Sequence, residues 1–178
     1  MIVFRLSKAQ FANDLSGKGA ELVGGRWNSR GNAMLYTSQS IALCVTEIAV
    51  HVPLGILPKD YQLVHIEIPD EDFLELKRLP KDWQTFPHSN STQMLGDKFL
   101  KEQKFLVLKV PSATVQGEFN YLVNPRHKNF NQIKVGDIVT LTHVEILVAD
   151  IKKPSKVEIR ERIETEKEAR AKLGDKPA

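Results

Sequence analysis

Apolar and polar residues alternate along residues 61–68 (YQLVHIEI), where every second position from Val64 to Ile68 is apolar. A period of two predicts a half-buried β-strand. Five other apolar segments predict further strands: residues 2–6, 34–37, 105–110, 115–123 and 138–148. The run at 105–110 (FLVLKV) is continuously apolar, which indicates a strand in the middle of a sheet.

Two segments have the composition of helices. The first is SIALCVTEIAV, for which Ser38 and Ser40 are both candidate N-caps, and it runs to about His51 before Pro53 stops it. The second helix is predicted over residues 91–103 (STQMLGDKFLKEQ), although it contains a glycine, which destabilises a helix interior.

Residues 71–79 are predicted as a short helix or an irregular segment. Strands and helices are mixed, without regular βαβ alternation or a GxGxxG turn. We therefore expect an α+β domain with a mixed or mainly antiparallel sheet core and flanking helices, and we do not expect a doubly wound sheet.

Composition supports one folded domain of about 150 residues. The chain has 178 residues, of which 42% are hydrophobic and 26% charged, with a formal net charge of +3. After Pro154 the sequence is dominated by charge, and Glu158 and Arg162 stand four positions apart, as on an exposed helix. We predict a folded domain at 1–150 and a charged, helical tail at 151–178.

The sequence argues against several functional classes. Lys and Arg are interleaved with acidic residues, so we do not expect direct binding of nucleic acid. We see neither a signal peptide nor an apolar run long enough to span a membrane, which makes a cytoplasmic location the expectation. The single cysteine, Cys44, lies in the apolar helix and is predicted to be a buried, inert thiol. The histidines do not have a recognised zinc spacing, so no metal site is expected.

A glutamate, Glu47, lies inside the apolar helix that ends near His51. Its helical neighbours are mostly apolar, and an isolated buried carboxylate is costly unless it is paired or used. It is either a partly exposed residue bonded to His51, or a carboxylate that faces a cleft and stabilises positive charge on a substrate. Arg26, in the turn GGRWN, either fixes a loop by a surface ion pair or grips an anion such as a phosphate.

Two further side chains have open interpretations. Tyr36 ends a short predicted strand, where it is either a core residue or a group that stacks on a ring or donates a hydrogen bond. Ser112 follows Pro111 after the apolar run, where it is either an ordinary turn residue or a hydroxyl facing a ligand.

The stretch LSGKGAELVGGRWNSRGNAMLYTSQSIALCVTEIAVHVPLGILPKDY resembles the RES-domain family. The later segments TQMLGDKFL and LKVPSATVQGEFNYLVNPRH also fit, so the resemblance covers roughly residues 2 to 133. It implies a fold similar to that of ADP-ribosyltransferase toxins, and a bacterial toxin that degrades NAD+ by breaking the nicotinamide–ribose bond. Phosphorolysis would yield nicotinamide and ADP-ribose 1''-phosphate, with NAD+ and inorganic phosphate as substrates and no bound cofactor. The implied partner is an Xre-like helix-turn-helix antitoxin, with which the toxin could form an oligomer.

The resemblance also implies a site. The family's arginine, tyrosine, glutamate and serine fall on Arg26, Tyr36, Glu47 and Ser112, and Asn120 lies in a matching segment. Glu47 would stabilise the oxocarbenium-like charge on the ribose, and Arg26 would hold the diphosphate or the incoming phosphate. Tyr36 would pack on the nicotinamide or its ribose, while Ser112 would bond ribose hydroxyls or phosphate.

The sequence departs from the family after the HKNF segment. Family members usually close with an aromatic–acidic segment, whereas this chain continues as IKVGDIVTLTHVEILVADIKK, in which residues 138–148 could supply the last strand. Three hypotheses follow: an NAD+-consuming enzyme, a transferase that moves ADP-ribose onto a protein through the same site, and a degenerate, non-catalytic binding protein.

Overall fold

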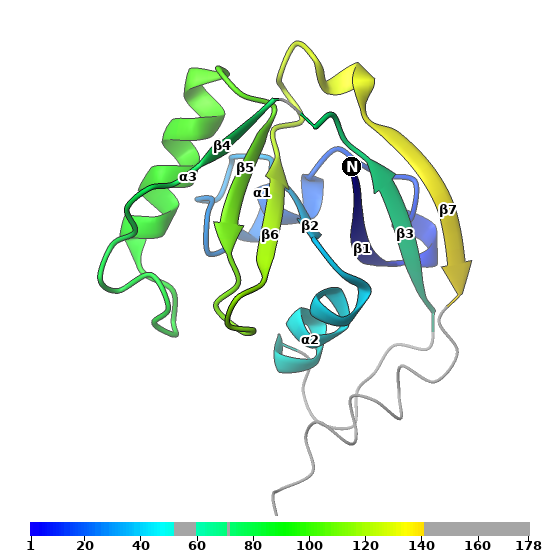
Figure 1. Ribbon diagram of the computed structural model, residues 1–178, viewed down its shortest axis with the longest axis horizontal. Helices are drawn as coiled ribbons and strands as arrows, with labels where there is room; N and C mark the ends of the chain where they lie inside the picture. The colour runs from blue at the N-terminus through cyan, green and yellow to red at the C-terminus, as the bar shows by residue number, and fades with distance from the viewer. Residues whose placement is uncertain (52–59, 71, 141–178) are drawn as a thin grey trace, which may run out of the picture.

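The computed structural model describes residues 1–51, 60–70 and 72–140 (Figure 1). Within these ranges the strands form one seven-stranded sheet in the order β4-β5-β6-β2-β1-β3-β7. All neighbouring strands are antiparallel except β4 and β5, which are parallel. The strands are β1 (Ile2–Lys8), β2 (Leu35–Ser38), β3 (Tyr61–Glu67), β4 (Phe73–Glu75), β5 (Val107–Pro111), β6 (Phe119–Val123) and β7 (Lys134–Thr140). The predicted α+β class with a mixed sheet is confirmed.

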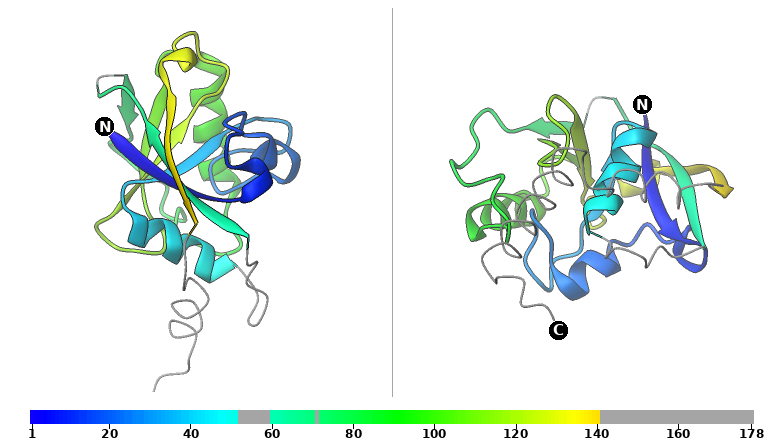
Figure 2. Two further views of the ribbon diagram at one scale, coloured as in Figure 1. Left: turned by 90° about the vertical axis from the view of Figure 1, so that its right-hand side faces the viewer. Right: turned by 90° about the horizontal axis from the view of Figure 1, so that it is seen from below.

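The helices of the described residues are α1 (Lys18–Val23), α2 (Ile41–His51) and α3 (Asn90–Glu102), with short 3-10 turns η1 (Ala9–Phe11) and η2 (Phe130–Gln132). The predicted N-cap Ser40 is confirmed, because its Oγ accepts the N–H of Leu43 at 3.1 Å. Figures 1 and 2 show α2 beside one end of the central strands and α3 near the β4 edge. The helices therefore flank the sheet, whose middle strand is β2, between β6 and β1.

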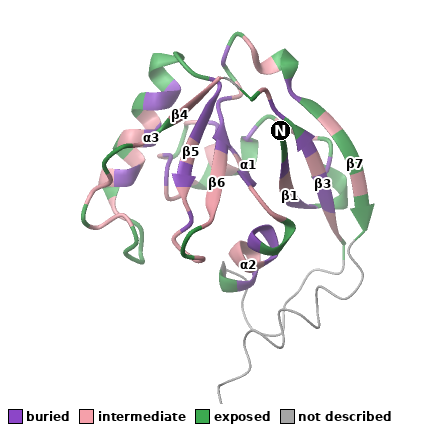
Figure 3. Ribbon diagram, viewed as in Figure 1, coloured by how far each residue is buried: buried purple, intermediate pink, exposed green. Residues whose placement is uncertain are grey.

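Strand β5 is buried on both faces, which explains its continuous apolar sequence (Figure 3). Val107 packs in one core cluster together with Val123, whereas Leu108 packs in a second cluster with Leu122 and Phe99 of α3. Because neighbouring residues of a strand point to opposite faces, β5 and β6 contribute to both clusters. The predicted strand is confirmed as one that pairs on both sides, with β4 and β6, although it lies second from the edge of the sheet and not in its middle.

Two predictions about the elements need correction. Residues 71–79 do not form a helix where the structure describes them; Phe73–Glu75 is the edge strand β4, paired with β5. The last predicted strand, 138–148, begins earlier, since β7 starts at Lys134 and pairs antiparallel with β3. The position of a final strand is thus filled by KVGDIVT, while residues 141–148 and the predicted tail at 151–178 lie outside the described residues.

Candidate active site

A cavity of about 920 Å³ opens between α2, the segment 17–27 and the loop that precedes α3. Four of the five predicted site residues line this cavity: Arg26, Tyr36, Glu47 and Asn120. They come from four separate parts of the chain, so their meeting depends on the whole sheet. Within the described residues, the cation and the carboxylate share one hollow.

Glu47 projects from α2 and is held by three hydrogen-bond donors. Ser112 Oγ and Asn120 Nδ2 both donate to Oε1 at 2.8 Å, and Thr114 Oγ1 donates to Oε2 at 3.0 Å. All three donors belong to the β5–β6 hairpin, which faces α2. The carboxylate therefore has a fixed position and orientation in the cavity wall, and its bonds go to neutral groups rather than to a cation. This geometry leaves its charge available to a ligand.

A second layer of contacts fixes the donors themselves. Ser38 lies opposite Asn120 in the β2–β6 ladder, and its Oγ donates to Asn120 Oδ1 at 2.8 Å. This bond sets the rotamer of the amide, so that Nδ2 faces Glu47. Ser112 is only 2% exposed, and its Oγ accepts the N–H groups of Thr114 and Val115 at 3.0 and 2.9 Å.

Ser112 therefore lies behind the carboxylate and not on the cavity surface. Its hydroxyl proton goes to Glu47, and both of its acceptor positions are filled by the backbone. The expected bonds from Ser112 to ribose hydroxyls or phosphate do not fit this arrangement. Its position is that of a residue that orients Glu47.

Arg26 reaches across to the loop before α3. Its Nη1 donates to the carbonyl oxygens of Trp83 at 2.6 Å and Thr85 at 3.0 Å. A guanidinium carries five N–H donors, so the groups on Nη2 and Nε are not used by these two bonds. Among the described residues Arg26 makes no ion pair, so the interpretation of a surface ion pair has no support there. The half-buried cation instead faces the cavity.

The hydroxyl of Tyr36 fixes the turn that carries Arg26. It donates to Asn28 Oδ1 at 2.7 Å and accepts the N–H of Trp27 at 3.1 Å. Burial raises the pKa of Tyr36 well above its usual range, so the phenol stays protonated. A Cβ at Gly25 would lie 2.6 Å from the same hydroxyl, which explains the glycine there. The polar end of Tyr36 thus serves the fold, while the side chain still lines the cavity.

Helix α3 supports this turn from the other side. Gln93 Nε2 donates to the carbonyl oxygens of Gly25 at 3.0 Å and Asn28 at 3.2 Å. A Cβ at Gly96 would stand 1.7 Å from the carbonyl oxygen of Trp27, so α3 and the turn touch backbone to backbone. The glycine that weakened the helix prediction is therefore required by this contact.

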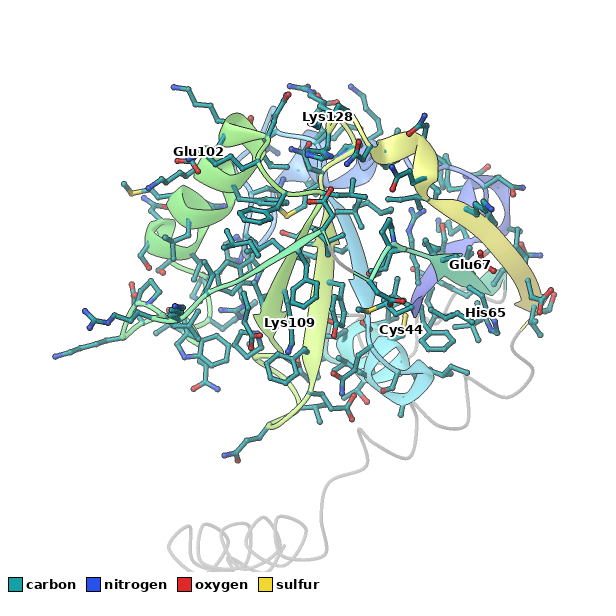
Figure 4. All side chains as sticks on the ribbon, turned by 45° about the horizontal axis from the view of Figure 1, so that its top comes forward. Cys44, His65, Glu67, Glu102, Lys109 and Lys128 are labelled. Carbon is teal, nitrogen blue, oxygen red and sulfur yellow. The ribbon has the colours of Figure 1, made fainter. Side chains whose placement is uncertain are left out.

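Cys44 lies one turn before Glu47 on α2, beside the central strands (Figure 4). It packs with Leu6 and Leu63 and is 6% exposed. Burial raises its pKa to about 12, so the thiol is protonated near neutral pH. The prediction that this cysteine is buried is confirmed.

Sequence reasoning missed several residues of the site. Thr114 and Ser38 complete the support of Glu47, and Arg5 of β1 lines the cavity with a guanidinium that donates to the carbonyl of Asp14. Burial lowers the pKa of Arg5. The two contacts that support Glu47 have no local sequence signal, because Thr114 bonds to a residue 67 positions away and Ser38 to one 82 positions away.

No group of three or more His, Cys, Asp or Glu side chains suited to a metal ion occurs in the part of the chain that the structure describes. A separate finding concerns membranes: among the same residues, no helix has the length and apolarity needed to cross one.

The fold is similar to that of a chain in the crystal structure of the Mycobacterium tuberculosis MbcT–MbcA toxin–antitoxin complex. The TM-score is 0.68 at 21% sequence identity, covering 84% of this chain and 87% of that chain. At this identity the likeness concerns the fold alone. It supports the predicted α+β fold class with a mixed sheet.

Residues 2–143 match the RES domain family, and the chain therefore belongs to that family. Curated relatives include a protein named Toxin Res from Photorhabdus laumondii, 36% identical over 74% of this chain and 86% of its own length. A protein from a Sphingobium species, named Prs ADP-ribosylating toxin, is 39% identical over 69% of this chain and 80% of its own. The predicted family is confirmed, and its members similar to this chain are toxins.

Proposed function

We propose that this protein is the toxin of a bacterial toxin–antitoxin system and acts in the cytoplasm by breaking the nicotinamide–ribose bond of NAD+. The observation that carries this proposal is the Glu47 carboxylate, held by three donors in the wall of a cavity that Arg26 also lines. In such a pair, the arginine is suited to bind a diphosphate, and the glutamate is suited to stabilise a sugar that becomes positively charged during the reaction.

Glu47 acts on the transition state. As the bond to nicotinamide lengthens, positive charge develops on the ribose, and a carboxylate beneath the ring stabilises it. The three hydrogen bonds hold the oxygens in place before the reaction, so little reorganisation is needed as the charge develops. Ser112 and Asn120 act through Glu47 as positioning residues, and Ser112 takes this role instead of binding the substrate.

Phosphorolysis is the reaction we propose. An oxygen of inorganic phosphate forms a bond to the ribose carbon as the carbon–nitrogen bond breaks, and the electron pair of that bond leaves with neutral nicotinamide. The products are nicotinamide and ADP-ribose 1''-phosphate. Arg26 holds the diphosphate or the incoming phosphate through its remaining N–H donors, which match the geometry of phosphate oxygens. Tyr36 packs beside the nicotinamide riboside.

Release of nicotinamide from NAD+ by the purified protein, with and without phosphate, tests the proposal. Wild type is expected to release nicotinamide, faster with phosphate, and Arg26→Ala is expected to lose most of this activity. Arg30→Ala is the matched control, because Arg30 is exposed in the same turn region and does not line the cavity. Absence of release by wild type, or equal losses in the two variants, would refute the proposal.

A second candidate function is transfer of ADP-ribose to a protein. The name of the Sphingobium relative favours it, and the same carboxylate would stabilise the same charge. Labelled NAD+ incubated with cell lysate separates the two reactions. A labelled protein band that does not depend on phosphate supports transfer, whereas products that form only with phosphate support phosphorolysis.

We further propose an Xre-like helix-turn-helix antitoxin as partner, which would carry any nucleic-acid binding of the complex. The similar fold of a chain from a toxin–antitoxin complex supports an antitoxin of some kind. Growth arrest on expression of this chain, relieved by co-expression of an Xre-like antitoxin, is the expected result. Unrestricted growth without any antitoxin would contradict the proposal.

A further inference from the structure

The loop before α3 places an aromatic ring at the cavity. Gln84, Phe86 and His88 all line the cavity wall. Phe86 is 78% exposed, the highest value among the exposed large hydrophobic side chains of the described residues. By comparison, Trp27 in the same wall is 3% exposed and belongs to the core. An apolar ring at a cavity surface gains free energy when a flat, apolar face covers it.

Arg26 determines where this ring lies relative to the proposed chemistry. Its two hydrogen bonds reach the carbonyls of Trp83 and Thr85, and Phe86 is the next residue along the chain. Glu47, in contrast, is held by the β5–β6 hairpin. Within the cavity lining, Arg26 is therefore bonded to the loop that carries Phe86, whereas Glu47 is bonded to the β5–β6 hairpin.

These attachments suit a dinucleotide, in which the diphosphate joins the nicotinamide ribose to the adenosine. If Glu47 faces the ribose of nicotinamide and Arg26 grips the diphosphate, the adenosine half extends toward the loop. A cavity of about 920 Å³ is within the range of pockets that enclose a ligand of this size. Gly19 leaves further room in the wall, because an added Cβ there would meet nothing within 4 Å.

We propose that Phe86 forms the adenine subsite by stacking its ring on the base. This inference rests on the proposed function for the placement of the nicotinamide half. Stacking on an aromatic side chain uses the π-face of the base, so it adds affinity for the dinucleotide without taking part in the bond cleavage. Phe86 is then a specificity-determining residue that distinguishes NAD+ from a mononucleotide.

Steady-state nicotinamide release from NAD+ and from nicotinamide mononucleotide, which lacks adenosine, tests this assignment. Phe86→Ala is expected to raise the KM for NAD+ about tenfold relative to the KM for the mononucleotide, as for the loss of one base–aromatic stack. Phe86→Trp is expected to restore the ratio. Met94→Ala is the control, because Met94 on α3 is 72% exposed and does not line the cavity.

Calorimetric titration separates a failure of this inference from a failure of the proposed function. Phe86→Ala is expected to weaken binding of ADP about tenfold and to leave binding of inorganic pyrophosphate as in wild type. If wild type releases no nicotinamide but binds ADP in this Phe86-dependent way, the reaction is wrong and the subsite stands. An unchanged KM ratio together with unchanged ADP affinity overturns the subsite, as does wild type that does not bind ADP. Equal rises in KM for both substrates would place the ring against the nicotinamide half, which also overturns it.

Discussion

Replacement of Glu47 by glutamine removes the charge at the centre of the site and keeps its shape. The two hydrogen bonds to Oε1, from Ser112 and Asn120, can be retained by the amide oxygen. The amide NH₂ then occupies the position of Oε2, where the hydroxyl of Thr114 can rotate to accept from it. The substitution is therefore expected to change the free energy of unfolding by less than about 1 kcal/mol.

The expected catalytic effect is much larger. Opposite unit charges 4 Å apart attract by about 4 kcal/mol at an effective dielectric constant of 20. The carboxylate is already fixed by its three donors, so this attraction is not spent on ordering the side chain. If it operates only in the transition state, its loss lowers kcat by about three decades, at about 1.4 kcal/mol per tenfold.

The assay is nicotinamide release at saturating NAD+ and phosphate, with urea unfolding of each variant as the measure of stability. Glu118→Gln is the matched control, since Glu118 also accepts a serine hydroxyl, that of Ser40 at 2.7 Å, but does not line the cavity. A kcat of Glu47→Gln within tenfold of wild type would refute the electrostatic reasoning. So would an equal loss in the control variant.

Three other predictions concern stability and reactivity. Tyr36→Phe removes one hydroxyl that serves two buried partners and is expected to lower the free energy of unfolding by about 1–3 kcal/mol, as measured in urea; a change within experimental error would contradict this. Gly96→Ala is expected to destabilise the protein in the same assay by about 1–3 kcal/mol or more, because its Cβ meets the carbonyl of Trp27. Gly19→Ala is the comparison: its Cβ meets nothing in α1, and the variant is expected to be about 0.5–1 kcal/mol more stable than wild type. The same sign for both variants would show that the contact is not tight. Cys44, with its pKa raised by burial from 9.0 to about 12, favours the folded state while it is protonated, so the unfolding free energy should fall as pH rises from about 9 toward 12. Alkylation by iodoacetamide at pH 8 should accordingly be at least about tenfold slower in native protein than in urea, and equal rates would refute the assignment.

The strands with a clear apolar pattern were predictable from sequence, because burial on a sheet face depends on local alternation. Residues 61–68 and the run at 105–110 show this in β3 and β5. Phe73–Glu75 was mispredicted because three residues are too short to show a period, and its parallel pairing with β5 joins residues more than thirty positions apart. The helix over Lys18–Val23 was also missed, since it has only six residues, contains Gly19 and is followed directly by Gly24 with φ of +77°.

For the candidate site, too, some residues were predictable from the sequence and others were not. The resemblance to a family located Arg26 and Glu47, which now line one cavity. The sequence did not reveal what Ser112 does, because its partner is 65 positions away and no local pattern links the two. Thr114 was missed for the same reason, since a hydrogen bond between the β5–β6 hairpin and a helix 67 positions away leaves no spacing rule in the chain.

The order of these groups along the chain has a consequence during synthesis. Arg26 and Glu47 emerge early from the ribosome, but every hydroxyl or amide that orients the carboxylate lies at position 112 or later. A nascent chain that ends before β5 thus displays the cation and the acid without the arrangement between them. For a protein that would harm its own cell, the harmful geometry is completed only when the β5–β6 hairpin folds against β2, late in translation.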